Sequence, residues 1–277
     1  MTEERTRSQI CDQETKRQQL KDWVTKCDPS LPYRSSLEKA LPGSGRWFLE
    51  YDFDTWLGEE SNNHPRIMWL RGRSGTGKTT LLSLAINYLK NVRRWTDTPA
   101  SAYFYCSFST KESQSAINML GSYIVQLCDQ IPKLWDLVDS LHAELKTRPP
   151  SEHESPKIVD LEKVLDSACG LTDKMVLFLD APNESDTSDE LLKVLFQLVN
   201  NNQNLQLLIS STEGLAMDSL LSPYGLVFTV RMDYRMVDDD IYSYIESRMQ
   251  NERRLKRLPI HLRNKITRKL AHNARGS

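Results

Sequence analysis

The chain has 277 residues, of which 36 are basic and 37 acidic, so its formal net charge is −1. That length suits one large α/β domain, or one domain with part of a second, and the even, interspersed charge does not indicate nucleic acid or an anionic membrane as a partner. No apolar run reaches the roughly 18 residues of a membrane-spanning helix, and the polar start Met1–Arg5 is no secretory signal, so we expect a cytoplasmic protein with no membrane partner.

Residues 8–27 carry apolar side chains at roughly helical spacing, which predicts an amphipathic helix. Its apolar stripe is narrow, so packing on the chain's own domain is favoured over binding a partner. Pro29, Pro32 and Pro42 should interrupt helical structure. The aromatic-rich residues 47–57 indicate a short helix that anchors this arm to the core, with a nearby base pocket as the alternative.

The most informative segment is Gly72–Thr79, which reads G-x-x-x-x-G-K-T, the phosphate-binding loop of nucleoside-triphosphate proteins. The apolar run Ile67–Leu70 precedes it, and a helical pattern over 81–89 follows it. Strand, glycine loop and helix in this order are the context that the motif requires.

The chemistry of this loop explains its spacing. Gly75 and Gly77 let the backbone bend so that its N–H groups converge on an anion, and the start of the next helix adds its positive dipole end. Lys78 brings a full charge to the outer phosphates, and Thr79 offers a hydroxyl to Mg²⁺. The expected nucleotide contacts are Gly72, Arg73, Ser74, Gly75, Thr76, Gly77, Lys78, Thr79 and Thr80.

Further along the chain, strands alternate with helices. Apolar runs predict strands at 102–106, 174–180, 205–210 and 226–230, and helical patterns cover 113–130, 133–146, 158–169, 188–200, 237–250 and 260–272. Strands that are apolar throughout indicate a mostly parallel sheet covered on both faces, that is, a three-layer αβα sandwich. We divide the chain into an N-terminal helical arm and linker (1–62), an NTPase core (63–232) and the start of a C-terminal helical domain (233–277).

A phosphate loop needs an acid that holds Mg²⁺ through water, expected at the end of a neighbouring buried strand. Asp180 ends such a strand and joins Thr79 as a metal-site residue. Glu184 is the candidate that orients or deprotonates the attacking water, because Asn183 beside it cannot accept a proton at neutral pH. Lys78, Asp180 and Glu184 form the predicted catalytic set, with a non-catalytic Glu184 as an equal alternative.

Two nearby segments favour structural roles. Thr187–Glu190 fits a capping box that opens the next helix, so Asp189 and Glu190 are excluded from catalysis. Ser211 and Thr212, at the end of the following strand, could hydrogen-bond a phosphate or water, but a strand-end turn explains them equally well.

The five cysteines are scattered without C-x-x-C spacing, which argues against a zinc site or a disulfide framework and for a reducing compartment. Cys106 lies in a strand-like run and Cys128 in a helical one. We expect both to be core residues rather than nucleophiles.

Several segments around the phosphate loop match the patterns of one family. They are Gly43–Leu49 (G-T-G-x-W-F-L in the family), Ala102–Tyr105 followed by Leu120–Leu127 (L-x-x-L-x-x-Q-L), Phe178–Glu184 (h-h-D-A-L-D-E) and Asp240–Ile245 (D-I-x-x-Y-I). From about Trp23 to Arg275, the chain resembles the NACHT NTPases of the STAND class of P-loop NTPases, in particular those of fungal NOD-like receptors.

The resemblance implies a nucleotide switch of innate-immune signalling, since family members hold nucleotide between the NTPase core and C-terminal helical domains and oligomerise when a sensor is engaged. It implies Mg²⁺ as cofactor, GTP or ATP as ligand with a slight lean to GTP, and self-association or other NOD-like receptor subunits as partners in the full-length context. Arg46 and Trp47, with Gly45, become the hypothesised base or ribose contacts.

Two departures from the family pattern bear on turnover. Asn183 replaces an aspartate, and Ser211–Thr212 stand where relatives place Ser-Arg, so the sensor arginine is missing. Losing transition-state charge slows phosphoryl transfer. We therefore expect a slow nucleoside triphosphatase (GTPase or ATPase), with a nucleotide-binding scaffold without significant hydrolysis as the alternative. A small-molecule kinase is a third hypothesis that rests only on Arg148.

Overall fold

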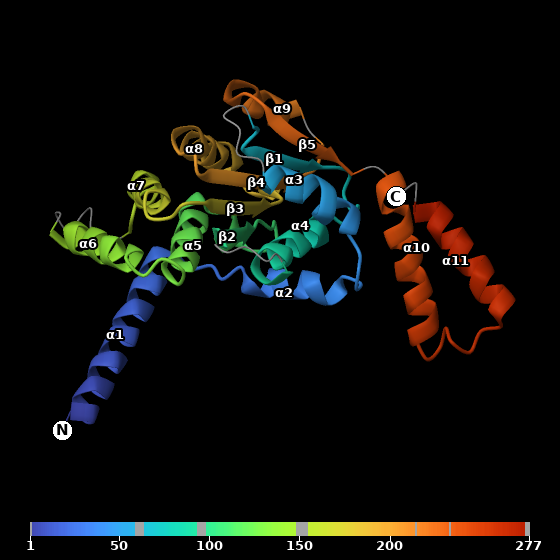
Figure 1. The fold of residues 1–277 in the computed structure, drawn as a ribbon, viewed down its shortest axis with the longest axis horizontal. Helices are drawn as coiled ribbons and strands as arrows, with labels where there is room; N and C mark the ends of the chain where they lie inside the picture. The colour runs from blue at the N-terminus through green and yellow to red at the C-terminus, as the bar shows by residue number, and fades with distance from the viewer. Residues whose placement is uncertain are drawn as a thin grey trace.

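The computed structural model describes residues 2–58, 64–92, 98–147, 155–213, 215–232 and 234–274. At its centre lies one sheet of five parallel strands in the order β2-β3-β4-β1-β5 (Figure 1). The strands are β1 (Ile67–Arg71), β2 (Ala100–Tyr105), β3 (Met175–Asp180), β4 (Leu205–Ser211) and β5 (Val227–Arg231). The predicted parallel sheet of apolar strands is confirmed.

Helices cover both faces of the sheet, which confirms the three-layer αβα sandwich (Figure 1). One face carries α5 (Ala116–Cys128), α7 (Ile158–Cys169) and α8 (Ser188–Asn201), while α4 (Lys78–Asn87), the π-helical turn η1 (Phe48–Phe53) and α3 (Asp54–Gly58) cover the other. The shorter or more peripheral elements are η2 (Tyr88–Val92), η3 (Lys111–Gln114), α6 (Leu134–Thr147), η5 (Pro182–Glu184), α9 (Leu215–Leu221) and η6 (Ser222–Tyr224).

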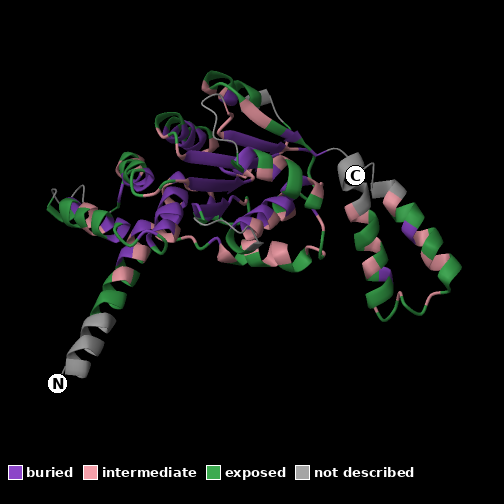
Figure 2. Cartoon of the chain, in the orientation of Figure 1, coloured by how far each residue is buried: buried purple, intermediate pink, exposed green. Residues whose placement is uncertain are grey.

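Strand β1 shows how the sheet divides the core in two. Ile67 and Trp69 join the apolar cluster that packs under α5, α7 and α8, whereas Met68 and Leu70 join the cluster under α4. Successive side chains of a strand point to opposite faces, so a run without polar residues fills both clusters at once. Figure 2 accordingly shows the central strands buried along their length.

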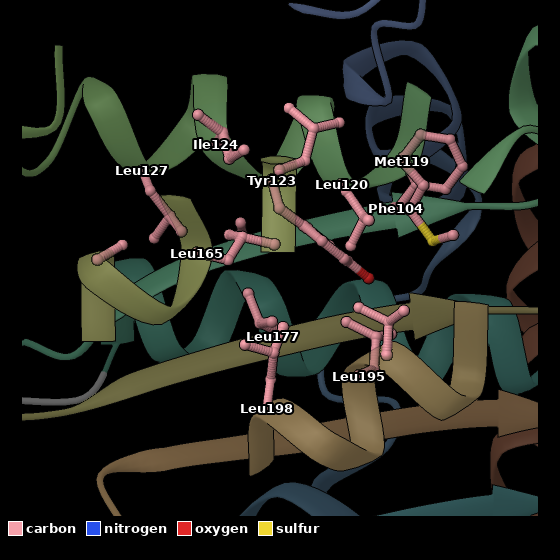
Figure 3. Close-up of a cluster of buried hydrophobic side chains, with 14 of the residues drawn as sticks. Phe104, Met119, Leu120, Tyr123, Ile124, Leu127, Leu165, Leu177, Leu195 and Leu198 are labelled. Atoms are coloured by element: carbon pink, nitrogen blue, oxygen red, sulfur yellow. The ribbon is translucent and has the colours of Figure 1, made fainter. Parts of the chain in front are cut away.

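The larger cluster holds a buried phenol. Figure 3 shows Tyr123 extending from α5 between apolar side chains toward the sheet, with Leu177 and Leu195 nearby. Its hydroxyl donates to the carbonyl oxygen of Phe178 at 3.0 Å. The ring therefore contributes packing area without leaving an unpaired polar group in the core.

The strand order differs from the expectation that the acidic strand neighbours the phosphate-loop strand. β4 lies between β1 and β3, so Ser210 pairs with Leu70 on one side and with Asp180 on the other. That expectation was wrong because spacing along the chain does not reveal which crossover connections skip a place in a sheet. As a result, Ser210 of β4 lies between the end of β1 and Asp180 at the end of β3.

Among the described residues, no further strand pairs with the outer edge of β2; two glutamines close it instead, Gln126 of α5 and Gln130 in the turn that follows this helix. Gln126 accepts from the Tyr103 amide at 3.1 Å and donates to the Tyr103 carbonyl at 2.9 Å. Four residues later, Gln130 accepts from the Ser101 amide at 2.9 Å and donates to the Ser101 carbonyl at 2.7 Å. Each side-chain amide offers the donor and acceptor that a neighbouring strand would offer.

The first helix, α1 (Thr2–Val24), packs its C-terminal end on the core, as the narrow stripe predicted. Leu20 and Val24 are buried in the larger cluster. Gly121 of α5 permits the contact, since a Cβ there would lie 2.3 Å from the carbonyl oxygen of Val24. The backbone of α1 therefore leaves no room for a side chain at position 121.

The second helix, α2 (Ser30–Lys39), corrects one expectation. Pro32 was predicted to interrupt helical structure, yet it lies in the first turn of this helix. The first N–H groups of a helix have no intrahelical acceptor, so proline removes no helical bond there. Position within the helix, which the sequence left undetermined, decides the effect of this residue.

After β5, the helices α10 (Tyr234–Asn251) and α11 (Ile260–Ala274) run side by side as a hairpin (Figure 1). Figure 2 shows most of their described residues exposed or half-buried, although Met249 and Thr267 are buried. The pair thus has little core of its own. The predicted domain boundaries after residues 62 and 232 stay predictions.

The described cysteine side chains are free thiols, with Cys106, Cys128 and Cys169 buried and Cys27 half-buried. The predicted core positions of Cys106 and Cys128 are confirmed. Within the described part of the chain, no helix combines the length and apolarity needed to cross a bilayer.

Candidate functional site

The phosphate loop joins β1 to α4 at the carboxyl edge of the sheet. Gly75 and Gly77 adopt left-handed backbone with φ of +81° and +88°. A Cβ at either position would meet nothing within 4 Å, so backbone conformation rather than space requires glycine there. The loop therefore leads into α4 with that helix's unpaired N–H groups directed at the edge of the sheet.

Lys78 folds back over this loop. Its Nζ donates to the carbonyl oxygens of Gly72 at 2.8 Å and Arg73 at 2.7 Å. Burial lowers the pKa of the ammonium, and the nearby charges of Asp180 and Glu213 oppose that effect. The side chain thus places a cation at the mouth of the loop.

Thr79, Asp180 and Ser210 meet at the same edge. Thr79 Oγ1 donates to Asp180 Oδ2 at 2.8 Å, and the Ser210 hydroxyl donates to Asp180 Oδ1. The side chain of Asp180 is almost wholly buried, and burial raises its pKa, with the two hydroxyls and Lys78 acting in the opposite direction. A cation beside this carboxylate would offset the cost of burying its charge.

These oxygens fit Mg²⁺, which prefers hard oxygen ligands and binds proteins through one or two carboxylates. Thr79 supplies a hydroxyl and Asp180 a carboxylate from two different elements, α4 and β3. The predicted metal-site residues therefore lie together and carry the right ligand chemistry.

A strained residue sets the direction of the chain after Asp180. Ala181 has φ of +50°, the single non-glycine residue with positive φ in the described part of the chain. The short turn η5 follows and separates its two polar side chains. Asn183 Oδ1 accepts from the Thr212 amide at 3.4 Å, whereas Glu184 Oε2 accepts from the Phe108 amide at 3.4 Å. Asn183 thus lies toward the end of β4, and Glu184 toward the loop after β2.

The expected capping box at the start of α8 is not formed. Thr187 precedes the helix but makes no side-chain cap bond. Its hydroxyl instead donates to the Gln114 carbonyl at 2.8 Å and accepts from the Ala116 amide at 3.2 Å. The Thr187 hydroxyl therefore forms tertiary hydrogen bonds beside the start of α5 in place of the local cap. The spacing of residues in the sequence does not reveal this choice.

A charged cluster that was not predicted from the sequence lies at the end of β4. Glu213 faces Arg71 at 3.7 Å and Arg231 at 3.6 Å. Arg71 also pairs with Asp218 at 3.2 Å and stacks over the Trp69 ring. The strand register, which sets Arg71 opposite Arg231, brings these residues together. The acid Glu213 therefore lies directly after Thr212, the position at which the sensor arginine is missing.

A second contact chain supports Thr79 from the other side. Ser83 donates to the Thr79 carbonyl at 2.7 Å and shares a 2.7 Å hydrogen bond with the hydroxyl of Tyr105. Tyr105 stands beside Asp180 in the sheet register. The first turn of α4 is thus fixed against β2 as well as β3.

A cavity of about 470 Å³ opens beside the phosphate loop. Residues of the loop and α4, of the segment 39–47, and of α10 line it together. Trp47 and Tyr244 contribute aromatic surface, and Asp240 contributes a carboxylate whose Oδ2 accepts from the Gly45 amide at 3.0 Å. Shape, position and apolar walls suit the base and ribose of a nucleotide.

The hypothesised base contacts separate in the structure. Trp47 lines the cavity, whereas Arg46 is 73% exposed in its side chain and pairs with Glu50 at 4.0 Å outside the lining. Asp240 was not predicted as a site residue, although it begins the D-I-x-x-Y-I pattern. That pattern was the available signal.

The family model described as Nephrocystin 3, N-terminal, matches residues 43–212, which is well over half of the chain. The match is consistent with the NACHT-type NTPase that the sequence resembles. None of the curated proteins compared with the chain matches it significantly.

Solved structures give weaker likenesses. The Aeropyrum pernix ORC1 protein in complex with DNA is 16% identical with a TM-score of 0.44, over 76% of this chain and 50% of that one. C. elegans PCH-2 is 15% identical with a TM-score of 0.42, over 91% and 66%. The Walker-type ATPase of Pyrococcus abyssi is 13% identical with a TM-score of 0.47, over 80% and 62%. This chain thus spans between half and two thirds of these solved chains.

Proposed function

The chain belongs to the Nephrocystin 3, N-terminal family, and from this premise we propose that it binds a purine nucleoside triphosphate at residues 72–80 and hydrolyses it slowly with Mg²⁺. One observation carries the proposal. The loop cation Lys78 and the oxygen pair Thr79 and Asp180 converge on the same edge of the sheet, although they come from α4 and β3.

The loop residues hold the phosphates in this proposal. Backbone N–H groups around Gly75 and Gly77, together with the start of α4, meet the negative charge, and Lys78 adds a point charge at the outer phosphates. The cavity behind the loop receives the nucleoside, between Trp47 and Tyr244.

Thr79 and Asp180 would hold Mg²⁺, whose bound form neutralises charge on the transferred phosphoryl group. Asp180 is kept in place by Ser210 and Thr79. Glu184 orients the attacking water, because it is the nearest acid after Asp180 along the turn η5.

Slow turnover is part of the proposal. The region after β4 offers Thr212 and Glu213 where a cation would stabilise the transition state, and Arg71 and Arg231 are both paired with Glu213. A missing arginine at such a position typically costs a factor of about 10³–10⁵ in rate. The nucleotide therefore acts as a long-lived switch ligand, GTP or ATP with a lean to GTP, in a NOD-like receptor-type signalling protein.

The same cluster favours a second candidate, a nucleotide-binding scaffold without significant hydrolysis. In that case the loop and cavity function unchanged, while Glu184 has no catalytic role. Arg148, the residue behind a small-molecule kinase, lies outside the described residues.

Phosphate release from purified protein with Mg²⁺ and GTP or ATP distinguishes the two candidates. We expect release to be slow and to fall by about 10²-fold or more in Glu184→Gln, with nucleotide binding retained. Lys78→Ala should lose binding, and Glu190→Gln, an exposed acid on α8, should change neither. Undiminished release by Glu184→Gln removes that residue's role, and tight binding without release over hours favours the scaffold.

A further inference from the structure

We propose that Asp240 selects a guanine base, by accepting hydrogen bonds from its N1–H and 2-amino groups; this inference rests on the proposed nucleotide site. The residue lines the cavity beside the phosphate loop from α10. It thus belongs to the C-terminal hairpin, while the phosphate contacts belong to the core.

With the residues that the structure describes, the Asp240 carboxylate forms one hydrogen bond. Its Oδ2 accepts from the Gly45 amide at 3.0 Å, across 195 positions of sequence. Gly45 has φ of +71° and lies directly on α4, where a Cβ would approach the Leu81 side chain to 2.6 Å. Since α4 begins at Lys78, the carboxylate and the phosphate loop are held by the same helix.

The second oxygen of this carboxylate, Oδ1, receives no hydrogen bond from the residues that the structure describes. An ionised carboxylate is acceptor-only and needs donors when a ligand displaces its water. Asp240 is thus a directional acceptor in a cavity whose other walls include Leu41, Leu84 and Ile241.

The chemistry of the purines decides which base satisfies such an acceptor. Guanine presents two adjacent donors, N1–H and the 2-amino group, which match one carboxylate oxygen or both. Adenine has an unprotonated N1 and a single donor group, the 6-amino group, on that edge. Lys39 at the same cavity supplies a cation suited to the guanine O6.

The test compares binding of GDP, IDP, ADP and XDP by calorimetry, with Mg²⁺ present, to the wild-type chain and to Asp240→Asn. Inosine lacks the 2-amino group, and xanthine replaces it by an acceptor. Asparagine keeps a carbonyl oxygen for the Gly45 amide and turns the other atom into a donor. The substitution therefore changes the hydrogen-bonding group that faces the base, while it keeps the contact between α10 and Gly45.

We expect wild-type protein to bind GDP at least about tenfold more tightly than IDP or ADP. Asp240→Asn should lose about tenfold or more in GDP affinity and gain affinity for XDP. Glu246→Gln removes the same charge from an exposed position of the same helix and should bind all four ligands as wild type does.

Two failures are distinguishable. If all four diphosphates bind equally in both variants and Lys78→Ala abolishes binding, the nucleotide site stands and Asp240 does not read the base. If none of them binds to wild-type protein, the proposed function itself fails. Equal ADP and GDP affinity in wild type, or an unchanged preference in Asp240→Asn, overturns the inference.

Discussion

Thr79 Oγ1 lies 2.8 Å from Asp180 Oδ2, although the two residues are 101 positions apart in the chain. The contact joins the first turn of α4 to the end of β3 across the intervening strand β4. It places a hydroxyl and a buried carboxylate where one divalent cation could bind both.

The first prediction concerns this pair. Thr79→Ala should abolish most of the gain in triphosphate affinity that Mg²⁺ confers, because one oxygen ligand is lost. Thr79→Ser keeps the hydroxyl and should retain the gain. Titrations of nucleotide with Mg²⁺ and with EDTA measure the difference. A Thr79→Ala protein with a full magnesium effect would show that the threonine is not a ligand.

A second prediction concerns Glu213. Glu213→Gln removes a negative charge near Lys78 and near both Arg71 and Arg231, so triphosphate affinity should rise several-fold, and more than diphosphate affinity. The gain should shrink at high salt, since the glutamate is partly exposed. Binding measured at two ionic strengths tests it, with Glu190→Gln as the control. Unchanged or weaker triphosphate binding would contradict the electrostatic role.

A third prediction concerns the contact between the arm and the core. Gly121→Ala places a Cβ 2.3 Å from the Val24 carbonyl oxygen, so α1 or α5 must shift. Forced overpacking of this kind costs about 1–3 kcal/mol, which thermal unfolding would record as a clear fall in Tm. Gly170→Ala is the matched control, because its nearest contact is 3.4 Å and its φ is −70°. Equal Tm values for the two variants would refute the close approach.

A fourth prediction follows from the buried thiols. Burial raises the pKa of Cys128 and of Cys169 to about 12. At pH 8 only about one thiol in ten thousand would be thiolate at such a pKa, so both should resist Ellman's reagent in the native protein. In denaturant the pKa returns to about 8.5 and both should react. Mass spectrometry after native labelling identifies the modified cysteines, and rapid labelling of either residue would contradict its burial.

The raised pKa values of Cys128 and Cys169 also determine the direction in which stability changes with pH. Because the folded-state pKa of these thiols lies above the unfolded value, the unfolded chain loses its thiol protons first as pH rises. Their contribution to stability is therefore fully present below about pH 8.5 and is lost progressively as pH rises toward about 12. Unfolding free energies measured between pH 7 and 10 should fall at the alkaline end.

Much of the fold was predictable because short segments of the sequence carry the patterns that determine its strands and its phosphate loop. Strands β1 and β3 are continuous apolar runs, and the phosphate loop carries its glycines and Lys78 within eight residues. The convergence of Lys78 and Asp180 follows, because the carboxyl ends of parallel strands share one edge of the sheet.

The remainder depends on long-range placement. The bond between Asp240 and Gly45 and the pairing of Glu213 with Arg71 exist only once the strand order and the path of α10 are fixed. Likewise, Thr187 exchanges a local cap for a tertiary bond to Ala116. Spacing along the chain cannot weigh such alternatives, since both satisfy the same hydrogen-bonding group.

The glutamines along β2 limit how copies of this molecule can join. An exposed edge strand invites a strand from another chain, and this route leads to fibrous aggregates. Here an incoming strand would first have to displace Gln126 and Gln130 from Tyr103 and Ser101, and so loosen α5. Any ordered assembly must therefore use helical or loop surfaces at this end of the sheet, and cross-β growth from β2 would require prior local unfolding.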